Sequence, residues 1–224
     1  ADVGFYGLMA LVGLYVGVIP VAIGMLWLPW IRRIDPRWVQ FVLALTVGLL
    51  AFLGIDALLE GTEIAATGPQ ALGGASLVFL GAGIAYLGLV AVDGWLRGRG
   101  ERAEQGGARP WRLAFLVALG IGLHNLGEGL AIGSAYAIGS LALGASLIVG
   151  FALHNTTEGL AIVSPVAKGG QAVKASLPRL AGLGLLAGAP AILGTWIGAS
   201  AFNPSVAALL FGLGAGAIAQ VIVQ

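Results

Sequence analysis

The segment GLHNLGEGLAIG, residues 122–133, places a histidine, an asparagine and a glutamate within a long apolar run. A second segment, ALHNTTEGLAIV at residues 152–163, repeats the three polar residues at the same spacing. Each run is long enough for a helix that crosses a lipid bilayer, which takes about 20 mostly apolar residues. Ionisable groups are costly inside a membrane, so two copies of one polar trio indicate a function.

The composition is typical of an integral membrane protein. Of the 224 residues, 58% are hydrophobic and 9% are charged, whereas a soluble domain carries about a quarter charged residues. So few charges cannot cover a surface that faces water. The chain has no cysteine, which excludes disulfides and thiolate metal ligands.

Seven apolar runs predict an all-α polytopic membrane protein. Strands are excluded as the spanning element because the runs are too long and do not alternate. We treat residues 1–224 as one transmembrane domain, with a flexible cytoplasmic linker at 97–110 and a first helix that lacks its beginning. The predicted spans are 4–30, 38–60, 71–96, 111–136, 140–166, 177–200 and 204–224.

The basic residues predict the orientation of these spans. Lysine and arginine accumulate on the cytoplasmic side of membrane proteins. All of them lie in or beside the connections after the first, third and fifth spans, which places the N-terminus outside a multi-pass protein of the cytoplasmic (inner) membrane. They are Arg32, Arg33, Arg37, Arg97, Arg99, Arg102, Arg109, Arg112, Lys168, Lys174 and Arg179.

The spacing of the two motifs predicts a metal site. His124 and Glu128 are four residues apart and share a helix face, and Asn125 lies on the neighbouring edge. Two such faces offer imidazoles, carboxylates and amide oxygens, which suit zinc, iron, manganese or cobalt, and a cation would relieve the repulsion between the carboxylates. Hydrogen bonding between helices is the alternative reading of a polar trio. The candidate ligands are His124, Asn125, Glu128, His154, Asn155 and Glu158.

The fourth and fifth spans are antiparallel, yet they carry one motif at matching depth. This pattern predicts a two-fold axis in the membrane plane, a common plan among transporters. Pro20 and Pro190 predict breaks in the first and sixth spans. Asp56, near the outer end of the second span, is either an interfacial residue or part of an ion entrance.

The paired motifs HNLGEG and HNTTEG resemble those of the ZIP (Zrt/Irt-like) family of divalent metal transporters, particularly its bacterial GufA-like branch. The resemblance covers essentially the whole chain and agrees with the orientation above. It implies a 3+2+3 inverted repeat of eight helices, seven of them visible and the eighth beyond Gln224. It also implies import of zinc, or of iron, manganese or cadmium, into the cytoplasm.

The resemblance further implies two metal positions, which share Glu128 and Glu158. It assigns His124 and His154 to the first position, and Asn125 and Asn155 to the second. The segment DALLE, residues 56–60, resembles the family's outer entrance. The chain departs from the branch at Ala189, before Pro190, where a glutamate ligand is usual, and this weakens the second position.

We therefore expect a transporter rather than an enzyme, with Zn²⁺ as the transported substrate. The expected partners are divalent metal ions and the lipid bilayer, without nucleic acid, and a homodimer is left open. One rival is a membrane-embedded di-metal enzyme, although such sites use Glu-x-x-His or His-Glu-x-x-His rather than His-x-x-x-Glu. The other rival is a receptor or structural bundle that transports nothing.

Overall fold

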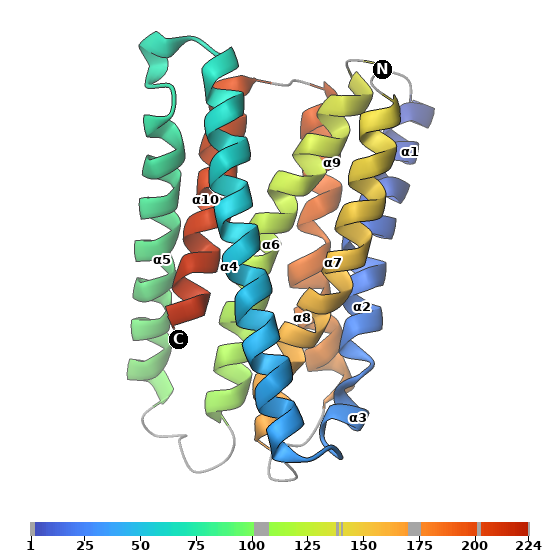
Figure 1. The fold of residues 1–224 in the computed structure, drawn as a ribbon, viewed down its shortest axis with the longest axis vertical. Coiled ribbons are helices and arrows are strands. Elements are labelled where there is room, and N and C mark those ends of the chain that lie inside the picture. Colours follow the sequence, from blue (N-terminus) through green and yellow to red (C-terminus); the bar gives the residue numbers. More distant parts are fainter. Residues whose placement is uncertain are drawn as a thin grey trace.

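The computed structural model describes residues 3–100, 108–137, 139, 141–169, 176–200 and 203–223. Every regular element within these ranges is helical (Figure 1). The elements are α1 (Val3–Gly13), η1 (Leu14–Val18), α2 (Ile19–Met25), α3 (Leu28–Ile31), α4 (Pro36–Thr67), η2 (Gln70–Leu72), α5 (Ser76–Gly100), α6 (Ala108–Ala137), α7 (Leu141–Lys168), α8 (Leu177–Gly188), α9 (Pro190–Ser200) and α10 (Pro204–Val223).

Six helical segments in the described part of the chain are long and apolar enough to cross a membrane. They match six of the seven predicted spans, and the prediction of an all-α, multi-pass membrane protein is confirmed. The segments are Val3–Ile31, Ser76–Trp95, Arg109–Ala137, Gly144–Lys168, Leu177–Ser200 and Pro204–Val223.

The predicted span 38–60 lies inside α4, which continues beyond it to Thr67. The start of α4 follows from local chemistry. Asp35 precedes Pro36, and the Asp35 carboxylate accepts a hydrogen bond from the Arg37 N–H at 2.8 Å. A side-chain acceptor before the helix and a proline in its first turn are both favourable, because the first N–H groups of a helix have no partner within it.

The helices also extend into the predicted linker at 97–110. Helix α5 continues to Gly100, and α6 begins at Ala108, so only residues 101–107 of that linker lie outside the described part. The ends of α3, α5 and α7 lie together at one end of the bundle, and the N-terminus lies at the other (Figure 1). The basic residues at these helix ends, such as Lys168 of α7, are therefore gathered at one end.

Helix α6 lies at the centre of the bundle and packs against α7, α8, α9 and α10. Its residues Ala118 and Ile121 belong to the largest apolar core, together with Ile162 and Val166 of α7. The outer surface is apolar as well, and Leu177 of α8 is 79% exposed. A large exposed apolar surface of this kind fits contact with lipid rather than water.

Both predicted proline breaks are confirmed. The π-helical turn η1 comes directly before α2 and Pro20, and Pro190 begins α9 after α8 has ended at Gly188. Proline has no N–H to donate and its ring clashes with the preceding turn, so each proline interrupts its helix. The two broken segments approach closely, because a Cβ on Gly17 of η1 would overlap the backbone of Gly188.

Candidate metal centre

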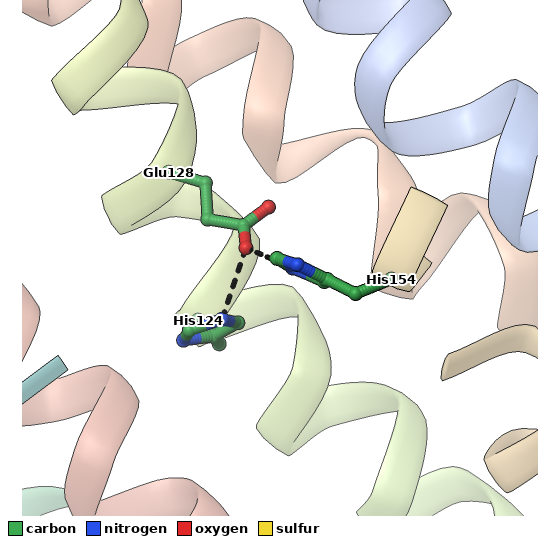
Figure 2. A group of neighbouring side chains, drawn as sticks. All are labelled: His124, Glu128 and His154. Carbon is green, nitrogen blue, oxygen red and sulfur yellow. Dashed lines mark hydrogen bonds and ion pairs between the residues drawn. The ribbon is translucent and has the colours of Figure 1, made fainter. Parts of the chain in front are cut away.

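Three of the predicted ligands meet between α6 and α7. His124 and Glu128 lie one turn apart on α6, with 3.1 Å between His124 Nε2 and Glu128 Oε1. His154 Nε2 of α7 contacts the same carboxylate oxygen. Figure 2 shows the carboxylate between the two imidazoles. His124 and His154 both lie near the midpoints of their helices.

The donor set of this group suits a metal ion. The donor atoms of His124, Glu128 and His154 all lie within 4.8 Å of one another. Ligand atoms on one tetrahedral zinc are about 3.3 Å apart, because zinc–ligand bonds are about 2.0–2.2 Å long. Small side-chain movements would therefore close the three donors around an ion. Glu128 is only 2% exposed, and positive charge or hydrogen-bond donors beside such a carboxylate stabilise its ionised form.

The two asparagines connect the motifs crosswise. Asn155 Nδ2 of α7 donates to Glu128 Oε2 of α6 at 3.1 Å. Asn125 Nδ2 of α6 donates to Glu158 Oε2 of α7 at 3.2 Å. The six predicted ligands thus form two sets at the α6–α7 contact. Glu128 joins His124, His154 and Asn155 in one set, and Glu158 joins Asn125 in the other.

Each asparagine makes a second bond to a backbone carbonyl at a helix break. Asn155 Nδ2 donates to Val16 O at 3.0 Å. Val16 stands four residues before Pro20, which has no N–H to offer to that carbonyl. Asn125 Nδ2 donates to Ala187 O at 3.0 Å, in the last turn of α8, where carbonyls lack partners within the helix.

Three buried oxygens of these two sets have no hydrogen-bond partner among the described residues. They are Asn125 Oδ1, Asn155 Oδ1 and Glu158 Oε1. Buried acceptors are nearly always partnered in folded proteins, so each exception requires an explanation. Amide and carboxylate oxygens are suitable ligands for a divalent cation. These oxygens are therefore candidate ligands for a cation.

Glycines bring the outer helices close to the two motifs. Gly129 of α6 faces Gly194 of α9, and Gly159 of α7 faces Gly24 of α2. A Cβ at any of these four positions would overlap a carbonyl oxygen of the facing helix. Each motif helix is therefore in backbone contact with one of the broken helices, directly after its glutamate.

The sequence analysis missed a repeat that accompanies these contacts. The segments PVAIG, residues 20–24, and PAILG, residues 190–194, share a proline and a glycine four residues apart. Both begin at a helix break and end at the glycine that meets a motif helix. The signal was present in the sequence, but it becomes specific only once the packing partners are known.

Asp56 lies on α4 and is exposed. It is near enough for its negative charge to act on His154, whose side chain is 21% exposed. Glu60 and Glu63 follow at intervals of four and three residues, so the three acids share one face of α4. Helix α4 also packs against α7, so the acidic face and the most accessible of the three ligands lie on neighbouring helices.

Other polar residues near the motifs make hydrogen bonds outside the candidate metal centre. Ser134 and Ser164 donate to Leu130 O and Leu160 O of their own helices, at 2.7 Å and 2.6 Å. Ala189 lies in the turn between α8 and α9, where its N–H donates to Leu185 O at 2.9 Å. Its methyl side chain offers no ligand to a second metal position.

Known proteins add nothing to this geometry, since neither a scan against protein-family models nor a search of curated proteins finds a match to the chain. The arrangement of the donors is therefore the basis for any statement about function. It combines nitrogen and oxygen donors, buried charge and two interrupted helices at one point in the bundle.

Proposed function

We propose that the protein transports divalent metal cations, zinc foremost, into the cytoplasm in the manner of the ZIP family. The observation that carries the proposal is the donor group of His124, Glu128 and His154, which lies between two apolar helices near their midpoints with two of its three members buried. Ionisable groups at such a depth mark ion pathways in many membrane proteins. Two neutral imidazoles and one or two carboxylates also match the ligand preference of zinc.

A second metal position is the weaker part of the proposal. The unpartnered oxygens of Asn125, Asn155 and Glu158 support it. Ala189 argues against a fully formed site, because the glutamate expected there by resemblance is missing. We therefore assign transport chiefly to the position at Glu128. Iron, manganese and cadmium are the expected competitors, since imidazole and carboxylate ligands discriminate poorly among these ions.

The proposed architecture is an inverted repeat of the 3+2+3 kind, centred on α6 and α7. The crosswise bonds of Asn125 and Asn155 support a two-fold axis in the membrane plane. The repeated segments 20–24 and 190–194 support it as well, because each packs against the opposite motif helix through its glycine. Interrupted helices around a central site are typical of secondary transporters.

The proposed direction follows from the charges at the two ends. The connections rich in arginine and lysine would lie in the cytoplasm, and the N-terminus would lie outside. Asp56, with Glu60 and Glu63 on the same face of α4, would then form the outer entrance. Acidic groups there would raise the local cation concentration, and His154 would be the first ligand that an entering ion reaches.

Uptake into proteoliposomes tests this function. The purified chain is reconstituted around a trapped zinc-sensitive dye, and Zn²⁺ is added outside. We expect Zn²⁺ to accumulate in vesicles that contain the protein, and accumulation to be lost in Glu128→Ala and His154→Ala. Ser134→Ala and Ser164→Ala are matched controls, because within the described part of the chain these hydroxyls bond to carbonyls of their own helices and to no member of the centre.

The same assay separates the rivals. A di-metal enzyme or a structural bundle would bind metal without accumulating it inside the vesicles. Zn²⁺ uptake no faster than in protein-free vesicles would therefore refute the transporter. Competition by iron, manganese and cadmium in the same vesicles then ranks the substrates.

A further inference from the structure

The amides of Asn125 and Asn155 have their donors fully used. A carboxamide nitrogen carries two N–H groups, and each of these nitrogens makes two hydrogen bonds. The partners are carboxylate and carbonyl oxygens, which only accept. The nitrogen must therefore face them and the oxygen must point elsewhere, so donation by Nδ2 and ligation by Oδ1 are separable functions of one side chain.

Each amide joins three elements of the fold. Asn155 of α7 links the carboxylate of Glu128 on α6 to the Val16 carbonyl of η1. Asn125 of α6 links the carboxylate of Glu158 on α7 to the Ala187 carbonyl of α8. Both asparagines are completely buried, so water cannot replace these bonds.

We propose that Asn125 and Asn155 are positioning residues, whose N–H groups tie each glutamate of the centre to a proline-broken helix. The orientation of Glu128 is thereby coupled to η1 and α2, and that of Glu158 to α8 and α9. A cation that draws either carboxylate toward itself pulls on the amide, and through it on the carbonyl at the break. The response of the two amides to a bound cation rests on the proposed function. Their hydrogen bonds to the glutamates and the carbonyls are present in the metal-free protein.

Aspartate at these positions distinguishes positioning from ligation. Asn155→Asp keeps an oxygen in place and adds charge, so a residue that served only as an oxygen ligand would bind metal as well or better. The substitution removes both N–H groups, however, and leaves Glu128 and Val16 O without their donor. We expect Asn155→Asp to weaken metal binding at least tenfold, the range found when partners that orient a ligand are lost.

The measurement is a titration of the purified protein with Co²⁺, followed by visible absorption, with Zn²⁺ competition to give the zinc affinity. The Co²⁺ spectrum reports ligand geometry only in folded, metal-bound molecules, so a general loss of stability would leave it unchanged. We expect an altered spectrum together with the lower affinity in Asn155→Asp, and the same in Asn125→Asp. Affinities within tenfold of the wild type would overturn the positioning role.

A second experiment needs no metal. Pro20→Ala supplies an N–H four residues after Val16, so the Val16 carbonyl gains a donor within its own helix. In this background Asn155→Leu leaves Glu128 without its amide donor, but the Val16 carbonyl keeps a partner. Asn155→Leu should therefore lower the melting temperature about half as much as it does in the wild-type background, which is the coupling that a double-mutant cycle measures. Pro190→Ala is the matched control, since Asn155 makes no bond at that break among the described residues. The falls in melting temperature caused by Pro190→Ala and by Asn155→Leu should simply add in the double variant.

Equal losses from Asn155→Leu in the wild-type and Pro20→Ala backgrounds would contradict the coupling to the break. Because melting is measured on the metal-free chain, this result is independent of transport. A chain that shows the coupling but neither binds nor carries Zn²⁺ would refute the proposed function and leave the positioning role standing.

Discussion

Glu128 and Glu158 occupy the same place in two nearly identical motifs, yet their surroundings differ. Glu128 contacts both His124 and His154, and it also accepts from Asn155. Glu158 accepts from Asn125, and its Oε1 has no hydrogen-bond partner among the described residues. Both carboxylates are 2% exposed, so burial does not explain the difference.

The asparagines of the two motifs make matching bonds, whereas the histidines do not. Each asparagine reaches the glutamate of the other helix, whereas both histidines turn to Glu128. Both imidazole nitrogens therefore lie at one carboxylate, whereas the other carboxylate keeps an oxygen without a hydrogen-bond partner among the described residues. If the proposed function is right, a borderline cation would bind more strongly at Glu128 than at Glu158.

The largest effect is expected from removal of the shared carboxylate. Glu128→Ala takes away a carboxylate that both histidines contact, and His154→Ala takes away the most exposed of the three ligands. Each should lower the rate of Zn²⁺ uptake by about 100-fold or more, beyond the 10- to 100-fold typical of residues that merely support a ligand. Vesicle uptake beside Ser134→Ala is the measurement. A wild-type uptake rate in Glu128→Ala would show that transport does not depend on this carboxylate, and a wild-type rate in His154→Ala would show the same for that imidazole.

A smaller loss is expected at the other glutamate. Glu158→Gln keeps an oxygen that accepts from Asn125, and it removes one negative charge from the weaker position. Zinc affinity should fall about tenfold, which is the lower end of the range for supporting groups, whereas Glu128→Gln should cost far more. Calorimetric titration of the two matched variants gives the ratio directly. Equal losses would mean that both carboxylates ligate one ion to the same extent.

Alanine substitutions at two glycines test whether α6 and α7 pack equally tightly against the interrupted helices. Gly129→Ala and Gly159→Ala each place a methyl group against a carbonyl of the facing helix, and overpacking of this kind costs about 1–3 kcal/mol. We expect similar falls in the melting temperature of the purified protein. Gly150→Ala on α7 is the control, because its added methyl group meets no atom within 4 Å. A much larger fall in melting temperature for one of these two variants would show that α6 and α7 differ in packing as well as in the contacts of their glutamates.

The smallest effect is expected at the proposed entrance. Asp56→Asn removes a negative charge that acts on His154, and no hydrogen bond or ion pair joins Asp56 to a ligand among the described residues. The KM for Zn²⁺ uptake should rise by a few-fold at low ionic strength with an unchanged maximal rate, and the difference should shrink as salt is added. Glu63→Gln, farther along the same face, should change KM less. An altered maximal rate in Asp56→Asn would assign that residue to the site rather than to its approach.

The membrane-spanning helices could be predicted closely because long apolar runs report burial in lipid directly. The expected span 177–200 coincides with the segment Leu177–Ser200. The end of α4 could not be predicted in this way. Glu60 and Glu63 end the apolar run, but glutamate favours helix, and α4 continues to Thr67. Hydropathy locates the apolar part of a helix and not the end of its hydrogen bonding.

The residues of the candidate centre could be predicted from helical periodicity, but their pairing could not. Spacing places His154 and Glu158 on one face of α7, whereas the rotation of α7 against α6 decides that His154 meets Glu128. The carbonyl partners of the asparagines were missed because backbone groups have no identity in a sequence. Pro20 held the one available clue, since it deprives the Val16 carbonyl of its usual donor.

The contact between Gly17 and Gly188 limits which residues these two positions can hold. Where η1 meets α8, a Cβ on Gly17 would overlap the backbone of Gly188, and a Cβ on Gly188 would overlap the backbone of Gly17 and Val18. An alanine at either position would therefore force the two segments apart. Because each segment belongs to an interrupted helix, one added methyl group would disturb both interruptions at once.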